Sequence, residues 1–319
     1  MTDLRLFDER VADSMSFLEK CFDDAEAYSF SPYLTRAIAA LRRVTMGGKH
    51  LRARLVHIGA GDVSGEQRTA ATIFAGAVDV LHAAFLIHDD IIDDDPLRRG
   101  LPTIHHEIAQ ETGSPAVGNA MGILAGDLGL IVTFQALCSS HIDDALARRA
   151  CTLLAGFAAQ TVSGEMLDVA HLQDDDVEID RVRLSNHLKT SLYSFTAPLH
   201  LGAVAAGRDD PATLAALRAV ADPLGVAYQA ADDIAGAVGT SEATGKVAGG
   251  DLDAGRKTLL TMRLEDMTLP EAVKEVIAEG DRFLAEARRG LSAPELSPLT
   301  VAGLSDIIDR VEEIVHAYA

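Results

Sequence analysis

Residues 66–95 read EQRTAATIFAGAVDVLHAAFLIHDDIIDDD, so a long apolar stretch leads into a run of aspartates without an intervening breaker. The apolar residues recur at spacings of three and four, which predicts a helix. If that helix continues, Asp89 and Asp93 project from one face, about 6 Å apart along its axis. Carboxylates this close repel one another, and aspartate is unfavourable at the negative end of a helix dipole. A hard divalent cation bound by these oxygens therefore explains the segment better than a solvated helix end does.

Two adjacent arginines, Arg98 and Arg99, follow the aspartates in the segment RRGLPT. Their guanidinium groups could hold phosphate oxygens through paired hydrogen bonds. Magnesium typically keeps one or two carboxylate ligands and completes its shell with substrate phosphates. The aspartates and the arginines together therefore predict a diphosphate site.

A second acidic pair, Asp232 and Asp233, lies late in another apolar segment, YQAADDIAG at residues 228–236. Taken alone, this pair fits a surface position as well as it fits a site. Two such helices packed antiparallel could hold metal ions between facing carboxylates, with a diphosphate bridging the ions. Basic residues, each of which by itself also fits an exposed helix end, stand out at 48–52, 189, 246 and 256–257.

Helical spacing of apolar residues recurs along the chain, for example at residues 31–44, 145–162 and 211–238. Segments that alternate apolar and polar residues between turns are missing, and the alanine-rich composition favours helix over sheet. Glycines and prolines divide one array of helices, without a long linker or a fixed repeat. We therefore predict an all-α protein with a single domain over residues 1–319.

The composition argues against several classes of protein. The chain has 28 Lys and Arg against 48 Asp and Glu, a net charge of −20, which opposes nonspecific nucleic-acid binding. A diphosphate would need a local group of cations within this repulsive field. The longest apolar stretch, residues 116–137, is interrupted by Asn119 and Asp127, so we expect a buried helix there and no membrane span.

The start of the chain lacks the basic and then apolar layout of a signal peptide. The three cysteines, Cys21, Cys138 and Cys151, are odd in number, far apart in sequence and without metal-type spacing. This argues against a disulfide framework or a zinc site. Both observations favour a cytoplasmic location.

Five motifs occur in order between residues 47 and 257. They are GGKHLR at 47–52, HDDIID at 88–93 with His82 upstream, RRGLPTIHH at 98–106, KTS at 189–191, and QAADD at 229–233 followed by GK at 245–246 and RKTL at 256–259. With this set and order the chain resembles the polyprenyl synthetase family, the trans-isoprenyl diphosphate synthases. The resemblance implies the isoprenoid synthase fold, a single large helical bundle around a central cavity. It also implies a homodimer and three Mg²⁺ ions in each active site.

The resemblance assigns roles to individual positions. The metal ligands it implies are Asp89, Asp90 and Asp93 of the first aspartate motif and Asp232 and Asp233 of the second. The isopentenyl diphosphate site is implied at Lys49, Arg52, His82 and Arg99. The allylic diphosphate site is implied at Arg98, Lys189, Thr190, Gln229, Lys246 and Lys257. Of all these residues, the five aspartates, Arg98 and Lys189 are expected to act in catalysis.

Two positions depart from the family pattern. The second aspartate motif usually ends in Asp, where this chain has Gly236, so the second metal face loses one carboxylate. His50 stands where Arg is commoner, and the charge at that position can depend on pH.

The implied reaction condenses isopentenyl diphosphate with an allylic diphosphate, which is dimethylallyl, geranyl or farnesyl diphosphate. Mg²⁺ and the cationic side chains would stabilise the leaving diphosphate while the isopentenyl double bond attacks the developing carbocation. The released diphosphate is the implied base, and apolar helices must keep water from the cation. No nucleophilic side chain is required.

Product length has one clue in the sequence. Phe85 lies four residues before Asp89, one helical turn deeper on the same face, where it could form the floor of the pocket for the prenyl tail. Ala84 is small and leaves space beside it. We expect a C15–C20 product, with geranylgeranyl diphosphate preferred over farnesyl diphosphate. Phe85 as an ordinary core residue stays an alternative.

Two other functions remain open. A terpene cyclase of the same fold ionises a diphosphate at an aspartate motif but needs no isopentenyl diphosphate site, so Lys49, Arg52, His82 and Arg99 speak against it. A catalytically silent subunit that regulates an active synthase is suggested by Gly236 alone. The intact first motif and its two arginines oppose that function.

Overall fold

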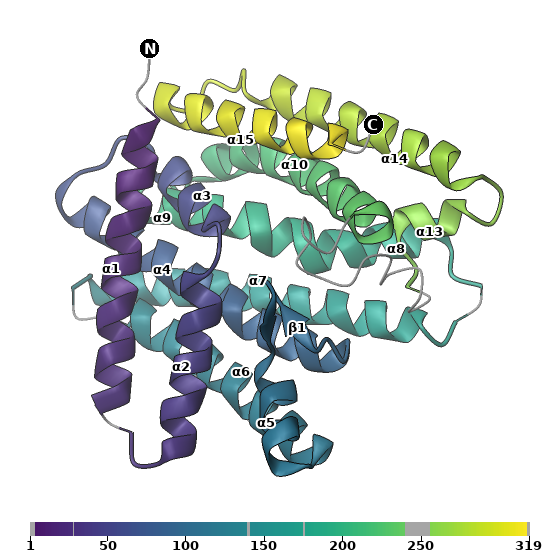
Figure 1. Ribbon diagram of the computed structural model, residues 1–319. Helices are drawn as coiled ribbons and strands as arrows, with labels where there is room; N and C mark the ends of the chain where they lie inside the picture. The colour runs from purple at the N-terminus through teal and green to yellow at the C-terminus, as the bar shows by residue number, and fades with distance from the viewer. Residues whose placement is uncertain (1–3, 28, 139–140, 175, 240–255, 318–319) are drawn as a thin grey trace. The chain divides into compact units, whose positions relative to one another are not determined.

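The computed structural model describes residues 4–27, 29–138, 141–174, 176–239 and 256–317 (Figure 1). Contacts within the chain divide it into two compact units. The N-terminal unit comprises Arg5–His57 and Val63–Cys151, and the C-terminal unit comprises mainly Thr152–Ala319 together with the short segment Ile58–Asp62. The assignment of the whole chain to one domain stays a prediction.

The N-terminal unit is built around one long apolar helix, α4, which spans Gly65–Ile92. Its buried side chains are mostly small and aliphatic, and α1, α2 and α6 pack against it. The helix that we predict to continue through Asp89 and Asp90 is therefore confirmed. The other helices of this unit are α1 (Arg5–Ala27), α2 (Pro32–Met46), most of α3 (Leu51–Ala60), α5 (Ile104–Thr112), α6 (Pro115–Leu137) and the start of α7 (Asp144–His171).

A short β-hairpin follows α4 and carries both arginines of the RRGLPT segment. Strands β1 (Leu97–Arg98) and β2 (Leu101–Pro102) pair antiparallel. The connecting residues Arg99 and Gly100 have φ angles of 52° and 75°. Positive φ at both central positions gives a turn whose twist matches that of the strands, and glycine adopts it readily. We expected no strands from the sequence, because strands of two residues are too short to show an alternating pattern.

The C-terminal unit has α10 (Pro211–Val238) as its long central helix, which confirms the helix predicted over residues 211–238. Helices α14 (Leu269–Gly290) and α15 (Pro298–His316) pack against α10 (Figure 1). The remaining elements of the unit are the rest of α7, α8 (Ile179–Asn186), the π-helix η1 (His187–Thr196), α9 (Ala197–Ala205) and α13 (Leu259–Arg263).

Several helices begin at a polar residue followed by proline. Ser31 before α2, Ser114 before α6 and Asp210 before α10 each accept a hydrogen bond from a backbone N–H of the first helical turn. Such a side chain satisfies a donor that has no partner within the helix. Proline at the next position lacks the N–H that would otherwise need a partner. The sequence thereby sets where these helices start.

The KTS motif lies in the π-helix η1. Turns of this kind are rare, and they occur frequently at functional sites. η1 packs on α10, and it also approaches α7 at Gly164, where an added Cβ would lie 2.5 Å from the backbone nitrogen of Lys189. Only glycine at this position leaves room for the motif, so the packing of α7 places Lys189.

Two of the described helices, α4 and α6, are long and apolar enough to cross a membrane by length and composition alone. In the most apolar window of α4, 78% is buried inside the protein, and in that of α6, 44% is buried. The core helix of a soluble protein passes the same test, so two such helices are weak evidence for a span. The expectation that no segment spans a membrane stays a prediction.

Candidate active site

The first aspartate motif lies at the C-terminal end of α4, where Arg98 of the hairpin pairs with it. Arg98 Nε donates a hydrogen bond to Asp90 Oδ1 over 2.5 Å, and Arg98 Nη2 donates to Asp89 Oδ2 over 3.3 Å. Asp90 is 2% exposed, and burial raises the pKa of its carboxyl group to about 6, although Arg98 opposes this shift. Asp93 follows as the C-cap of α4. The predicted metal ligands and the predicted phosphate-binding arginine are therefore neighbours.

His82 of α4 lies within the electrostatic influence of three arginines. Arg52, Arg98 and Arg99, which we call the arginine cluster, all act on its imidazole. Burial first, and then repulsion from these guanidinium groups, hold the pKa of His82 well below its usual value, so the ring is neutral at pH 7. Burial and repulsion from Arg98 and Arg52 also lower the pKa of Arg99. Cations gathered this closely favour the binding of an anion.

Arg99 connects the hairpin to the GGKHLR motif. Its Nη1 donates to the carbonyl oxygen of Val44 over 3.0 Å, and a Cβ added at Gly47 would lie 3.2 Å from the same nitrogen. A cavity of about 250 Å³ opens here, and Arg43, Gly47, Asp90, Arg98 and Arg99 contribute to its lining. The N-terminal unit thus brings both arginines of the RRGLPT segment, the GGKHLR motif and the first aspartate motif to one place.

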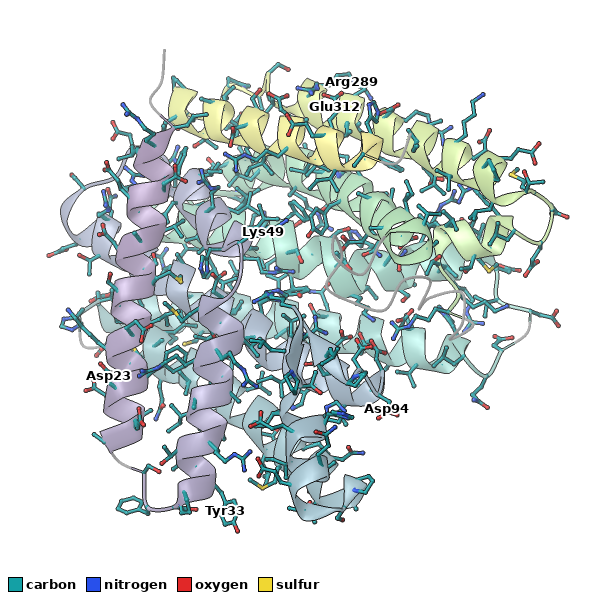
Figure 2. The ribbon with its side chains drawn as sticks, viewed as in Figure 1. Asp23, Tyr33, Lys49, Asp94, Arg289 and Glu312 are labelled. Atoms are coloured by element: carbon teal, nitrogen blue, oxygen red, sulfur yellow. The ribbon has the colours of Figure 1, made fainter. Side chains whose placement is uncertain are left out.

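Lys49 is exposed in the short loop before α3 (Figure 2). The next residue, His50, places its Nδ1 2.7 Å from Asp79 Oδ2 of α4. Asp79 is 6% exposed, and its other oxygen accepts the backbone N–H of Ala53 over 3.2 Å. Asp79 therefore holds the start of α3. Sequence reasoning does not identify Asp79, although a lone acidic residue inside an apolar helical stretch is a usable signal, since a buried carboxylate needs partners.

In the C-terminal unit, Lys189 of η1 contacts two carboxylates of α7. Its Nζ lies 2.8 Å from Asp168 Oδ2 and 2.9 Å from Glu165 Oε2. Sequence reasoning also misses these two acidic residues. Their signal is the spacing in GEMLD, which puts two like charges on one helix face, where a cation between them is favourable. The contact orients the ammonium group of Lys189, which is expected to bind the allylic diphosphate. Thr190 follows Lys189 in η1.

The two residues of the second aspartate pair differ in environment. Asp232 is exposed, whereas Asp233 is 2% exposed. Asp233 accepts hydrogen bonds from Gln229 Nε2 over 2.7 Å and from the backbone N–H of Leu259 over 2.9 Å. Asp233 therefore ties α10 to the first residue of α13, two positions after Lys257. Its metal-binding role, like that of Asp232, stays a prediction.

Two further positions complete the predicted set. Gly236 lies half-buried on α10, one helical turn after Asp232. Lys246 lies outside the described residues.

Ala84 and Phe85 lie on different sides of α4. Ala84 is fully buried, and a Cβ added at Gly129 of α6 would lie 2.7 Å from its own Cβ. The backbone of α6 at Gly129 therefore occupies the space that we expect beside Ala84. Phe85 lies on another side because successive residues of a helix point in different directions. Phe85 is partly exposed, and its role as the floor of the tail pocket stays a prediction.

The donor atoms of the first aspartate motif fit a hard divalent cation. Asp89, Asp90 and Asp93 offer carboxylate oxygens, which Mg²⁺ prefers as ligands. Among the described residues, no three His, Cys, Asp or Glu side chains are grouped so that they could hold a metal ion by themselves. Mg²⁺ completes its shell with phosphate oxygens and water, so one or two carboxylates and a diphosphate form a sufficient ligand set.

Comparison with known proteins assigns the family. The profile of the Polyprenyl synthetase family matches residues 34–287, and the chain belongs to this family, as its motifs predict. It is similar to the geranylgeranyl diphosphate synthase of Saccharolobus solfataricus, with 31% identity over 276 residues that cover 86% of this chain and 76% of the relative. It is also similar to the farnesyl diphosphate synthase of Escherichia coli, with 32% identity over 220 residues that cover 67% of this chain and 70% of the relative.

Solved structures agree with this assignment. The crystal structure of geranylgeranyl pyrophosphate synthase from Corynebacterium glutamicum, complexed with isoprenyl diphosphate and magnesium, matches with a TM-score of 0.86 and 26% identity. The match covers 98% of this chain and 99% of that chain. The predicted isoprenoid synthase fold is therefore confirmed.

Proposed function

We propose that the protein is a Mg²⁺-dependent prenyltransferase that condenses isopentenyl diphosphate with an allylic diphosphate. The observation that carries this proposal is the arginine cluster beside Asp89 and Asp90. Anion-binding cations and cation-binding carboxylates lie together, which suits a metal-bound diphosphate. The relatives in Saccharolobus solfataricus and Escherichia coli, which are named as geranylgeranyl and farnesyl diphosphate synthases, support the same reaction.

The N-terminal unit has two kinds of role in this proposal. Isopentenyl diphosphate binds to Lys49, Arg52 and Arg99, and His82 donates a hydrogen bond without adding another charge to the cluster. Arg98 binds the allylic diphosphate, whose metal ions are held by Asp89, Asp90 and Asp93. The arrangement of Arg98 with Asp89 and Asp90 supports this division, since the phosphate-binding and metal-binding groups are in contact.

The C-terminal unit supplies further groups for the allylic diphosphate. Lys189 donates hydrogen bonds to it, and Glu165 and Asp168 orient the ammonium group. Asp232 and Asp233 bind metal, and Asp233 also holds the segment that carries Lys257. The remaining residues that we assign to this substrate are Thr190, Gln229, Lys246 and Lys257.

The chemistry follows from these contacts. Bound Mg²⁺ would neutralise the allylic diphosphate and assist cleavage of its C–O bond. Arg98 and Lys189 stabilise the charge that develops on the departing oxygens. As that bond breaks, the isopentenyl double bond forms a new C–C bond to the allylic carbon. The isopentenyl unit then loses a proton to the released diphosphate, so no side chain acts as a nucleophile.

The test is product chromatography after incubation of the purified protein with Mg²⁺, isopentenyl diphosphate and each allylic diphosphate in turn. A new prenyl diphosphate formed with consumption of isopentenyl diphosphate is expected. A hydrocarbon formed without that consumption would identify a terpene cyclase. An absence of turnover would favour the silent subunit and refute the proposal.

Asp89→Asn in the same assay tests the metal site. We expect it to lower kcat by about 10²–10³-fold, because it removes a metal ligand that stabilises the leaving group. Asp94→Asn is the matched control, since the Asp94 side chain is 98% exposed and has no assigned role. Equal losses in the two variants would contradict the assignment. Chelation by EDTA should abolish turnover, and added Mg²⁺ should restore it.

The proposed product is C15–C20, with geranylgeranyl diphosphate first. The relative from Saccharolobus solfataricus and the similar structure from Corynebacterium glutamicum, both named for this product, support the choice. We expect Phe85→Ala to form longer prenyl diphosphates than the wild type in the chromatography, because the pocket loses its floor. Unchanged product length would show that Phe85 is an ordinary core residue.

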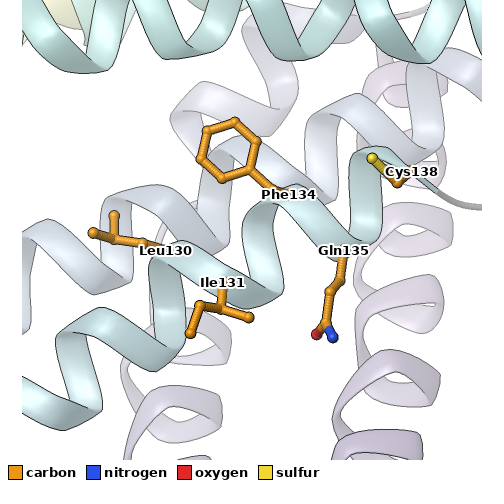
Figure 3. Close-up of a pocket in the computed structure, with 5 residues that line it drawn as sticks. All are labelled: Leu130, Ile131, Phe134, Gln135 and Cys138. Atoms are coloured by element: carbon orange, nitrogen blue, oxygen red, sulfur yellow. The ribbon is translucent and has the colours of Figure 1, made fainter.

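The proposed assembly is a homodimer located in the cytoplasm. Helix α6 supports the homodimer, because apolar side chains such as Leu124 and Ile131 are 59% and 55% exposed on it. A pocket of about 440 Å³ lies along the same helix and is lined by Leu130, Ile131, Phe134, Gln135 and Cys138. Figure 3 shows these side chains and where they leave the helix. Exposed apolar surface of this kind is typical of a protein interface.

A further inference from the structure

Helix α3 starts next to the arginine cluster, but the residue directly before it, His50, is a poor cap. The carbonyl oxygen of His50 accepts the backbone N–H of Arg54 over 3.0 Å, which makes His50 the N-cap. Histidine is not among the side chains that cap helices well. His50 also has a φ angle of 53°, in the left-handed region that costs free energy for a residue with a Cβ.

Asp79 of α4 supplies the missing cap. One of its oxygens accepts the backbone N–H of Ala53 in the first turn of α3, and the other accepts the Nδ1–H of His50. A carboxylate at this position satisfies a donor without a helical partner and interacts favourably with the positive end of the helix dipole. The two contacts of Asp79 therefore hold both the helix start and the strained residue before it.

The Asp79–His50 pair lies among the residues proposed to bind isopentenyl diphosphate. Lys49 precedes His50 directly, and Arg52 follows it by two positions. Asp79 also acts on Arg99. Burial and repulsion from Arg98 and Arg52 lower the pKa of Arg99, and the negative charge of Asp79 partly offsets this shift. A shift at the start of α3 would thus move Lys49 and Arg52 relative to Arg99.

We propose that His50 and Asp79 are positioning residues that direct Lys49 and Arg52 to the diphosphate of isopentenyl diphosphate. The inference rests on the proposed function. Its specific consequence is that the two substrates are affected differently, because Arg98 and the aspartates at the end of α4 hold the allylic diphosphate without contact with His50 or Asp79. Loss of the pair weakens binding of isopentenyl diphosphate and leaves binding of the allylic substrate nearly unchanged.

The experiment measures KM for each substrate separately in His50→Ala and Asp79→Asn. KM for isopentenyl diphosphate should rise roughly tenfold or more, as expected for loss of a hydrogen bond to a charged group, while KM for the allylic substrate changes less than about twofold. His50→Arg keeps a donor for Asp79, and it should return KM to near the wild-type value. Asp62→Asn, at an exposed position after α3, is the matched control and should change neither KM.

Two results would overturn the inference. One is an unchanged KM for isopentenyl diphosphate in folded His50→Ala, and the other is an equal rise in both KM values. If the wild type shows no turnover, the proposed function fails, and the inference is then tested by calorimetric binding of inorganic diphosphate. His50→Ala should bind it more weakly than the wild type and His50→Arg, and equal affinities would refute the positioning role. If Asp79→Asn does not fold, the partly exposed His50 still gives the result.

Discussion

A buried histidine in the N-terminal unit makes stability depend on pH. His57 is fully buried, and its Nε2 lies 2.9 Å from Ser14 Oγ, which itself donates to the carbonyl oxygen of Arg10 over 3.1 Å. Burial, reinforced by repulsion from Arg10 and Arg68, lowers the pKa of His57 from 6.5 to about 3. Between these two pH values, the unfolded chain binds a proton that the folded protein excludes.

The expected outcome is a loss of stability as the pH falls. Because the unfolded state binds more protons in this window, the free energy of unfolding decreases below pH 6.5 by up to about 1.4 kcal/mol per pH unit from His57 alone. His57→Gln removes this titration, so urea unfolding measured from pH 7.5 to 5 should give a shallower dependence for the variant. Carboxylates titrate in both proteins, and parallel curves would contradict the prediction.

Individual site residues could be predicted where the partners are close in sequence. Asp89, Asp90 and Arg98 meet because one helix end and one tight turn connect them. The contacts of Asp79 with His50, and of Lys189 with Asp168, join different helices that are separated by many residues. Such pairs depend on how the helices pack, and the charge of each residue alone does not specify its partner.

At the scale of elements, long helices could be predicted because their apolar periodicity extends over many turns. Helices α4 and α10 have nearly the predicted bounds. The hairpin and the π-helix could not be predicted for different reasons. The strands have two residues each, and the π-helix contains residues that also fit an α-helix. The π-helix packs on α10 and approaches α7 closely at Gly164, and these contacts are not readable from its own sequence.

Two glycines of α7 provide a matched test of that packing. A Cβ added at Gly156 would have nothing within 4 Å, whereas one at Gly164 would lie 2.5 Å from the backbone nitrogen of Lys189. Gly156→Ala should stabilise the protein by about 0.5–1 kcal/mol, since alanine loses less backbone entropy than glycine in a helix. Gly164→Ala should destabilise it by about 1–3 kcal/mol through overpacking.

Denaturant unfolding of both variants measures these free energies. Gly164→Ala should also lower kcat, because the substitution displaces Lys189 from its place beside Glu165 and Asp168. Gly156→Ala serves as the control for the general effect of alanine in α7. Equal shifts in stability would mean that η1 does not rely on close approach to this helix.

At the scale of the whole molecule, the exposed apolar side of α6 predicts self-association. Leu124→Lys and Ile131→Lys together should shift the protein from dimer to monomer, because the charges would be buried without partners in the interface. Sedimentation velocity over a range of concentrations measures the change. Asn119→Lys adds a charge at an exposed position of the same helix and is the control. A wild type that sediments as a monomer would refute the homodimer.

The arginine cluster within a chain of net charge −20 affects how substrates arrive. At 0.1 M salt, solvent ions screen the charge of the protein beyond the Debye length of about 10 Å. In dilute buffer the screening is weaker, and the net negative charge of the protein repels an approaching diphosphate. Added salt therefore accelerates the diffusional encounter by screening this repulsion. The same salt weakens the contacts with the cluster and accelerates dissociation. Because the two rate constants rise together and oppose each other in Kd, the equilibrium affinity changes less with ionic strength than the more salt-dependent of the two rate constants.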